Sequence, residues 1–392
     1  MHLELSDEQE LFTTSLREWL GERAGSSSVR GWLDTGDPAA FERLFVDEGW
    51  AAVGFGEDLG GQGGGLLELA LTARELGRAA APSAGWLQSA IVVPALSSEP
   101  ALVRAATETG DVTALAVRAD RIPAAVASVE SCDGRLRGRI PCVLGAARSR
   151  RLLVPVADGK ATSLWLVDGA ADGVGLHPRP MLDRSRDVAD VVLDGVAARR
   201  LDIDATAALG EIATRAAILV AADALGAAER MLQLAVDYSK QRQQFGRPIG
   251  SFQAVKHAAA QMLVTVESSM SIVCYAAQSA EEGLPERAIH AAVAKAQVTR
   301  GGAEIADSAL TLHGAIGYTW EHDLHLFYKR AKLDRVLFGT PAAWNERIAD
   351  VLLTGPREVV HGERESFLGG YGWQPSGLGV GSPGLNVSGG GT

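Results

Sequence analysis

The sequence predicts an α+β protein with three successive parts: an N-terminal helical domain, a middle β-sheet or barrel domain and a C-terminal helical bundle. Before residue 110 and after residue 204, apolar residues recur every three or four positions, which is typical of amphipathic helices. Between these regions, short segments rich in β-branched and aliphatic residues are broken by Gly, Asp and Pro, which indicates strands. We therefore place the domains at residues 1–110, 111–203 and 204–354.

Composition and charge narrow the function classes. The chain has 392 residues, of which 47% are hydrophobic and 22% charged, so it can form more than one packed domain. Its net charge of −11, without a clustered basic stretch, argues against nucleic-acid binding. Cys132, Cys142 and Cys274 show neither metal-ligand spacing nor a disulfide framework. With an acidic start and no apolar run of membrane-spanning length, the sequence predicts a cytoplasmic protein with no membrane contact.

The N-terminal region is predicted to be helical throughout. Ser6 and Gln9 have the spacing of a capping box at the start of the first helix. Further helices are expected over residues 41–50 and 66–80, and the helical region ends near Thr109. The glycine-rich stretch 54–65 between them is predicted to be a turning loop. No strand precedes it and no Gly-Lys-Ser or Gly-Lys-Thr follows, so a phosphate-binding loop is rejected.

The middle and C-terminal regions differ in the spacing of their apolar residues. Strands are predicted at 112–119, 124–129, 136–144, 151–156, 163–168 and 188–193. Helices are predicted to return after residue 204, with the longest over 212–240, 252–282 and 285–313. Beyond residue 354 the sequence is rich in Gly, Ser and Pro, so we expect a disordered tail over 355–392.

The stretch from Tyr238 to Gln253 joins two of the predicted helices. Gly246 and Pro248 break the helical pattern, and Ser251 is the expected N-cap of the next helix. Arg242 and Gln244 would then lie beside the free N–H groups of that helix, which suits a phosphate. The alternative is an ordinary helix hairpin, in which Arg242 caps carbonyl groups and Phe245 fills the core.

The sequence Arg-Gln-Gln-Phe-Gly-Arg-Pro-Ile at 242–249 resembles the signature of the acyl-CoA dehydrogenase family. The order of helical, strand and helical regions is also that of the family, whose last domain is a four-helix bundle. The resemblance implies that this stretch reaches the pyrophosphate and adenine side of an FAD held by a neighbouring protomer. The cofactor-binding residues predicted here are Arg242, Gln244, Phe245, Gly246 and Gln253.

A second stretch, residues 312–326, is similar to the family segment that surrounds the adenosine end of FAD across the dimer interface. The resemblance adds His313, Gly314 and Gly317 to the predicted cofactor site, although Thr311 stands where the family usually has glutamine.

Residues 312–326 also contain three histidines, His313, His322 and His325, which could suggest a metal site. We instead expect Glu321 and Asp323 to pair with Lys329 and Arg330, so no metal site is predicted.

The parts that carry the family's chemistry are missing. A carboxylate must remove the α-proton of the acyl-CoA, and one branch of the family places it before a Gly-Thr pair. Here Phe338 precedes Gly339 and Thr340. The position used by another branch lies within 214–217, which holds no carboxylate, and Glu211 is out of register. The segments that would hold the flavin ring, 117–123 and 142–144, lack the family's hydroxyl and aromatic groups, so no catalytic residue is predicted.

The resemblance therefore implies a non-catalytic subunit of a heteromeric, sterol-type acyl-CoA dehydrogenase. It would share FAD with a catalytic sister chain in a heterotetramer, meet acyl-CoA through that complex, and have an electron-transfer flavoprotein as a further candidate partner. Two alternatives stay open. One is a self-sufficient homo-oligomeric flavoenzyme with Glu321, Asp323 or Glu211 as its base, and the other is a flavin-free scaffold of the same fold.

Overall fold

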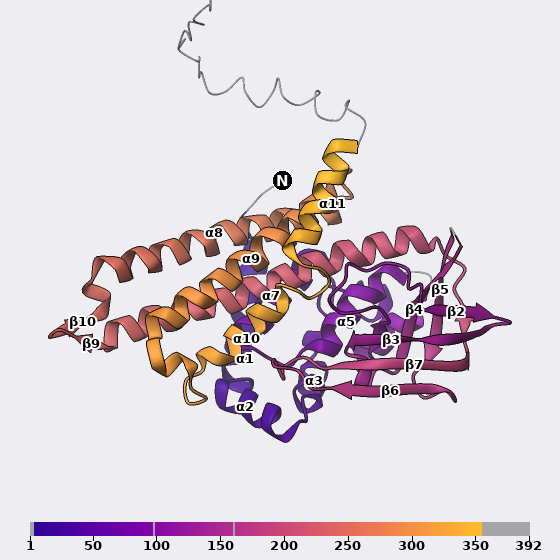
Figure 1. Cartoon of the computed structure of the whole chain (residues 1–392), viewed down its shortest axis with the longest axis horizontal. Helices are drawn as coiled ribbons and strands as arrows, with labels where there is room; N and C mark the ends of the chain where they lie inside the picture. Colours follow the sequence, from indigo (N-terminus) through magenta and orange to yellow (C-terminus); the bar gives the residue numbers. More distant parts are fainter. Residues whose placement is uncertain (1–3, 97–98, 160, 355–392) are drawn as a thin grey trace, which may run out of the picture. The chain divides into compact units, whose positions relative to one another are not determined.

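The computed structural model describes residues 4–96, 99–159 and 161–354, and the predicted tail over 355–392 lies outside these residues. Met1–Ala349 form one compact unit, to which the contacts below belong. Helices precede strands, and strands precede a second set of helices, so the predicted α+β class is confirmed (Figure 1). Helix α6 ends at Glu108 and helix α7 begins at Ala205, but the division into three domains stays a prediction.

The N-terminal helices begin as the sequence predicts. Ser6 accepts from the N–H of Gln9 and the Gln9 side chain bonds back to Ser6, which confirms the capping box. Segment 41–50 is helix α3 followed by a 3-10 turn. Helix α2 lies within the region predicted to be helical but was not placed individually, because its Ser-rich start and Gly31 have low helix propensity. The helices are α1 (Asp7–Arg23), α2 (Ser26–Thr35), α3 (Ala39–Asp47), α4 (Leu66–Ala79), α5 (Ala84–Val92) and α6 (Pro100–Glu108).

The middle region forms two four-stranded sheets, in the orders β1-β4-β5-β8 and β2-β3-β7-β6. The strands are β1 (Thr113–Leu115), β2 (Val129–Cys132), β3 (Arg135–Leu144), β4 (Arg151–Asp158), β5 (Ala161–Asp168), β6 (Val174–Arg179), β7 (Val188–Ala197) and β8 (Arg199–Arg200). The predicted strand over 124–129 is wrong apart from its last residue and one bridge at Val126. Strand β6 was missed because it contains Pro178, which an edge strand tolerates.

The C-terminal helices surround α7 (Ala205–Gln241), which packs against α4, α8 (Gln253–Glu281), α9 (Arg287–His313) and α10 (Leu324–Asp334). The chain ends its described part in α11 (Pro341–Thr354). Helix α7 is long and apolar enough to cross a membrane by length and composition, but 67% of its apolar window is buried inside the protein. Its apolar character is that of a central core helix.

Helices α4 and α7 cross at two glycines. A Cβ on Gly226 of α7 would overlap the carbonyl oxygen of Arg74 in α4, and a Cβ on Gly77 of α4 would overlap the carbonyl oxygen of Asp223 in α7. These clashes involve backbone, which cannot move away as a flexible side chain can.

We expect Gly226→Ala to lower the free energy of unfolding by about 1–3 kcal/mol, because the two helices must separate to admit the methyl group. Gly210→Ala is the matched control on the same helix, since nothing lies within 4 Å of its Cβ position. That substitution should raise stability by roughly 0.5–1 kcal/mol through helix propensity. Urea unfolding of both variants measures the effect, and equal stability of the two would contradict the packing argument.

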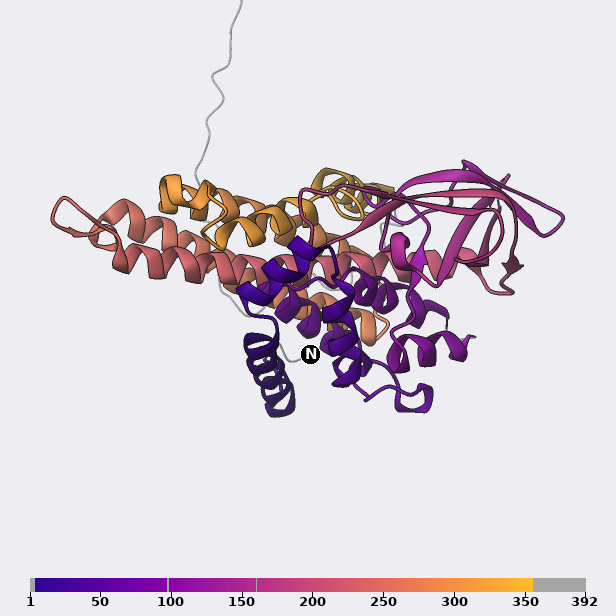
Figure 2. The ribbon, with the colours of Figure 1, turned by 90° about the horizontal axis from the view of Figure 1, so that it is seen from below.

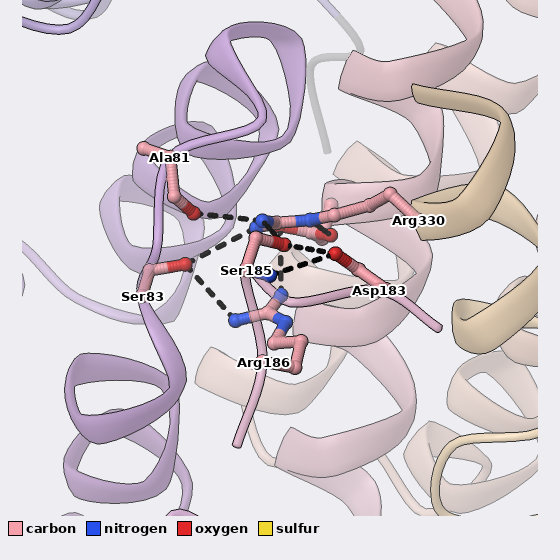
Figure 3. A network of polar contacts seen from close by, with 7 residues as sticks. Ala81, Ser83, Asp183, Ser185, Arg186 and Arg330 are labelled. Carbon is pink, nitrogen blue, oxygen red and sulfur yellow. Dashed lines mark hydrogen bonds and ion pairs between the residues drawn. The ribbon is translucent and has the colours of Figure 1, made fainter. Parts of the chain in front are cut away.

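A buried charge cluster joins the three regions (Figure 3). Arg330 of α10 donates to both carboxylate oxygens of Asp223 in α7, at 2.7 and 2.6 Å. It also donates to the carbonyl oxygen of Ala81 at 2.7 Å and to the Ser83 hydroxyl at 3.1 Å, both in the turn before α5. Arg186, from the segment before β7, lies 3.0 Å from the same Asp223 carboxylate. One carboxylate therefore holds two buried guanidinium groups.

The charged groups in this cluster shift one another's pKa values. Burial alone would raise the pKa of Asp223, but Arg330 and Arg186 hold it below its usual range. Burial and the charge of Asp223 raise the pKa of Asp334 well above its usual range. Neither carboxyl oxygen of Asp334 accepts a hydrogen bond from a described residue, and its interaction with Asp223 raises the pKa of Asp334 and lowers that of Asp223.

Candidate functional site

The signature stretch forms a short hairpin that joins the end of α7 to the start of α8. Strand β9 (Gln243–Gln244) pairs antiparallel with β10 (Arg247–Pro248). The two residues between them, Phe245 and Gly246, have φ of 55° and 77°, as a type I′ turn requires. Figures 1 and 2 both show the hairpin extending beyond the ends of the neighbouring helices.

The hairpin presents its side chains to solvent. Phe245 is 91% exposed, and its ring meets the edge of Phe252 at 6.1 Å. The backbone N–H of Arg242 caps α7 by donating to Tyr238, but its exposed side chain makes no hydrogen bond or ion pair with a described residue. The alternative in which Arg242 caps carbonyl groups and Phe245 fills the core is therefore wrong. An exposed cation and an exposed ring remain at the tip.

Helix α8 begins without a side-chain cap. Ser251 was predicted to be its N-cap, but Ser251 lies in a 3-10 turn over Ile249–Ser251, and Phe252 occupies the N-cap position. The prediction was wrong because Ser251 belongs to this turn, so the N-cap position falls on the next residue. The first N–H groups of α8, near the exposed Gln253, are left without a side-chain acceptor.

The second predicted stretch lies beside the base of the hairpin. The ring of His313, at the end of α9, stacks on Tyr238 with centroids 4.8 Å apart and meets His322 at 4.5 Å. His313 is 3% exposed, and its Nδ1 bonds the carbonyl oxygen of Ala309 at 2.7 Å. Burial lowers the pKa of His313, which favours the neutral form of its ring. His313 thus joins α9 to α7 one helical turn before Arg242.

The two glycines of this stretch have different surroundings. Gly314 is exposed, with φ 65° and nothing within 4 Å of its Cβ position, and its N–H donates to the carbonyl oxygen of Leu310. Gly317 is buried, and a Cβ there would lie 3.0 Å from both His313 and Leu310. Gly317 therefore serves close packing, and Gly314 offers the accessible backbone.

The predicted ion pairs of this stretch are wrong. Asp323 pairs with Arg30 of α2 at 2.7 Å, and Arg330 turns inward to Asp223. The prediction failed because it paired neighbours in sequence, whereas α2, which it had not placed individually, supplies the partner. Within the described residues, no group of His, Cys, Asp and Glu could hold a metal ion. Burial, together with Lys329, lowers the pKa of His325 to about 4.

The segments at the family's flavin-ring positions, 117–123 and 142–144, lie next to the segment around Phe338, where the family places its base. The N–H of Phe338 donates to the carbonyl oxygen of Ala119 at 2.6 Å, and the N–H of Ala119 donates to that of Cys142 at 2.9 Å. Phe338 is 1% exposed, and Trp344 donates to its carbonyl oxygen. A Cβ on Gly339 would lie 2.6 Å from the side chain of Ile122. These segments are packed against one another.

No carboxylate faces this junction from the expected positions. Thr214, at the position used by the other branch, is buried and donates to the carbonyl oxygen of Gly210. Glu211 pairs with Arg215 at 2.7 Å along α7. Neither of the two expected positions therefore supplies a free carboxylate at this junction.

Lys295 of α9 is a residue that the sequence analysis missed. It is fully buried, and its Nζ donates to the carbonyl oxygens of Gly339 at 2.9 Å and Asp334 at 3.0 Å. It holds the loop that follows Phe338. The only signal in the sequence is a lysine on the apolar face of a predicted helix.

Comparison with known proteins gives two family matches. Residues 6–107 match the model described as acyl-CoA dehydrogenase, N-terminal domain, and residues 207–353 match acyl-CoA dehydrogenase, C-terminal domain. The acyl-CoA dehydrogenase IpdE2 of Mycobacterium tuberculosis is 32% identical over 356 residues, covering 89% of this chain and 99% of that protein. The acyl-CoA dehydrogenase FadE34 of the same species is 33% identical, covering 90% of this chain but 49% of that protein.

Solved structures share the fold. A variant of the Tcur3481-Tcur3483 steroid ACAD has a TM-score of 0.81 at 26% identity, covering 89% of this chain and 98% of that one. The ChsE4-ChsE5 complex from Mycobacterium tuberculosis has a TM-score of 0.80 at 23% identity, covering 91% of this chain and 100% of that one. These likenesses confirm the helical, strand and helical architecture.

Proposed function

Because the chain belongs to the acyl-CoA dehydrogenase family, we propose that it is a non-catalytic subunit of a heteromeric, FAD-dependent acyl-CoA dehydrogenase. Members of this family use FAD. The complex would catalyse α,β-dehydrogenation of an acyl-CoA thioester, with the base and the flavin ring supplied by a catalytic sister chain.

The observation that carries the proposal is the packing around Phe338. A general base must lie within hydrogen-bond reach of the proton that it removes. Phe338 has no titratable group, is buried, and is bonded through its N–H to the segment that would otherwise face a flavin ring. The chain thus keeps the backbone of the family's active centre without its reactive group.

The exposed hairpin supports a role toward a cofactor in another chain. Arg242 can form a charge-assisted bond with a pyrophosphate, and the exposed ring of Phe245 can stack on an adenine. The same end of the cofactor would be contacted by Gln244, Gly246 and Gln253. Gly314 would offer its backbone to the adenosine, with His313 and Gly317 holding that backbone in place. When bound, FAD would supply the hydride-accepting chemistry of the complex, and the residues of this chain would hold only its adenosine and pyrophosphate end.

Two of the solved relatives carry names of paired proteins, Tcur3481-Tcur3483 and ChsE4-ChsE5, and the first is named a steroid ACAD. They support a paired assembly, such as a heterotetramer, in which the partner sets the acyl specificity. An electron-transfer flavoprotein as electron acceptor and a cytoplasmic location remain part of this proposal. So do the domain boundaries at residues 110 and 203.

The two alternatives have less support. In the self-sufficient enzyme, Asp323 would have to leave Arg30 and Glu211 would have to leave Arg215, while Glu321 is exposed on the loop before α10. In the flavin-free scaffold, the exposed Arg242 and Phe245 would have no cofactor to bind.

Flavin stoichiometry tests the proposal. The chain is purified alone and together with a candidate catalytic acyl-CoA dehydrogenase from the same genome, and flavin per chain is counted by absorbance. We expect no stoichiometric flavin and no acyl-CoA turnover from the chain alone, and both from the complex. Stoichiometric flavin on the chain alone, with turnover, would establish the homo-oligomeric alternative.

Arg242→Ala in the purified complex should weaken FAD binding by about 1.5–3 kcal/mol, because a charge-assisted bond to pyrophosphate is lost. The dissociation constant, followed by flavin fluorescence, should rise about tenfold to a hundredfold. Lys240→Ala is the matched control, since it removes one exposed positive charge two residues away that already pairs with Asp237. Equal FAD affinity of the two variants would favour the scaffold.

A further inference from the structure

A separate cavity of about 280 Å³ opens among the helices α1, α4, α7 and α10. Its apolar wall contains Leu20 and Phe327, which are both buried. Of the described residues, three arginines and one glutamate form its charged lining, and these are Arg17, Arg78, Arg230 and Glu75. At 1.5 Å a residue, Arg230 lies about 18 Å along α7 from Arg242, so this cavity is separate from the hairpin.

The two carboxylates at the cavity are already held by arginines. Glu75 accepts two hydrogen bonds from Arg17, at 2.9 and 2.7 Å, and its side chain is 1% exposed. Glu229, the neighbour of Arg230 on α7, accepts from Nε of Arg74 at 2.8 Å, and Nη2 of Arg74 lies 2.7 Å from the same oxygen. Each carboxylate is therefore matched with one guanidinium group.

The other two arginines of the lining, Arg78 and Arg230, have no hydrogen-bonded carboxylate among the described residues. Nη1 of Arg78 lies 3.6 Å from Glu229, which is too far for a hydrogen bond. Arg230 is half-buried and forms neither a hydrogen bond nor an ion pair with a described residue. Burial lowers the pKa of Arg78, and the charges of Arg17 and Arg230 add to that effect. Glu229 and Glu75 oppose it only in part.

The charges of this group do not balance. Of the described residues it contains four arginines and two glutamates, which are Arg17, Arg74, Arg78, Arg230, Glu75 and Glu229, so two positive charges are left over. The three arginines of the lining come from α1, α4 and α7, so they approach from three helices. A phosphate monoester at pH 7 carries about −1.5 to −2 charges and has three strong acceptor oxygens. A carboxylate has one charge and two oxygens, which suit a single guanidinium group.

We propose that this cavity binds a phosphate group through Arg78 and Arg230. The phosphate oxygens accept from the two guanidinium groups that no carboxylate hydrogen-bonds, and the negative charge offsets the repulsion between them. Arg17, whose side chain is 42% exposed, keeps its bonds to Glu75 and adds a third positive charge. The ligand is inorganic phosphate or a small phosphate monoester, whose carbon body would lie against Leu20. The small volume of the cavity suits either of these ligands.

Titration calorimetry on the full chain tests the site with inorganic phosphate, glycerol phosphate and acetate at constant ionic strength. We expect phosphate to bind at least tenfold more tightly than acetate, because acetate brings one charge and two oxygens. Glycerol phosphate that binds at least as tightly as inorganic phosphate identifies a phosphate monoester as the ligand. Tighter binding of inorganic phosphate identifies the free ion. The absence of saturable binding by both, or equal affinity for acetate, would overturn the proposal.

Arg230→Met tests the contact itself. The substitution keeps an apolar stem and removes the cation, so phosphate affinity should fall about tenfold or more, as expected when a bond to a charged group is lost. Because the charge of Arg230 opposes that of Arg78 and has no carboxylate partner, the variant should be at least as stable as the native protein without phosphate. Saturating phosphate should raise the unfolding temperature of the native protein and leave that of Arg230→Met unchanged.

Arg104→Met is the matched control, because Arg104 is exposed on α6 outside this cavity and its loss should leave phosphate affinity unchanged. Arg230→Lys keeps the charge without the planar guanidinium group, so its affinity should lie between those of the native protein and Arg230→Met. The result does not depend on the proposed subunit role, because the chain is tested without a partner. Phosphate affinity that Arg230→Met leaves unchanged would contradict the assignment of this cavity.

Discussion

Asp223→Ala is expected to lower the free energy of unfolding by about 3–5 kcal/mol, the range found when one partner of a buried ion pair is removed. The carboxylate of Asp223 receives two hydrogen bonds from Arg330 and lies 3.0 Å from Arg186, and both guanidinium groups are buried. Without it, Arg330 keeps hydrogen bonds only to uncharged groups of Ala81, Ser83 and Ser185, and Arg186 keeps one to Ser83. Urea unfolding followed by circular dichroism measures the change.

The control for Asp223→Ala is an ion pair of the same residue types at the surface. Asp194 pairs with Arg137 at 3.2 Å, and their side chains are 74% and 75% exposed. Asp194→Ala should change stability by less than about 1 kcal/mol, because solvent screens an exposed pair. A loss of the same small size for Asp223→Ala would show that the cluster does not hold the three regions together.

The sequence predicted the long helices well and this cluster not at all. Apolar spacing placed a helix at 212–240, where α7 spans Ala205–Gln241, because 3.6-residue periodicity is a local property of a buried helix. Asp223 interrupts that apolar stripe, and its partner Arg330 is 107 residues away. The sequence analysis gave Arg330 a nearby carboxylate, since nothing local identifies a distant one.

The candidate sites likewise combine features that the local sequence predicted with features that it could not predict. Gly246 and Pro248 predicted the break between two helices, because their backbone preferences act locally. The exposure of Phe245 and the stacking of His313 on Tyr238 depend on where whole helices end, which spacing does not give. The cavity at Arg230 was beyond prediction, since it needs α1, α4, α7 and α10 to meet.

Lys295→Met is expected to abolish a rise in stability between pH 7 and 10.5. Burial lowers the pKa of Lys295 from 10.5 to about 7 in the folded protein, against the opposing effect of Asp334. In that pH window the unfolded chain carries a proton that the folded chain has released, so the stability of the native protein increases with pH. The slope approaches about 1.4 kcal/mol per pH unit.

The measurement compares urea unfolding at pH 7.5 and pH 9.5 in the native protein and in Lys295→Met. The difference in stability between the two proteins should shift by about 2–3 kcal/mol in favour of the native protein at the higher pH. Lys256→Met, at an exposed position on α8, is the control and should follow the native curve. Parallel curves for the native protein and Lys295→Met would mean that the buried amine does not titrate in this range.

The direction of this pH effect follows from what Lys295 contacts. Its Nζ donates to two backbone carbonyl oxygens, at Asp334 and Gly339, and a neutral amine still has two N–H groups to donate. Loss of the proton therefore removes a buried charge without breaking either bond. The charge of Asp334 favours the ammonium form of Lys295, but burial outweighs it and lowers the pKa of Lys295 to about 7. The loop after Phe338 should then stay closed on both sides of pH 7, so that the rise measures the cost of burying the charge and not an opening of the loop.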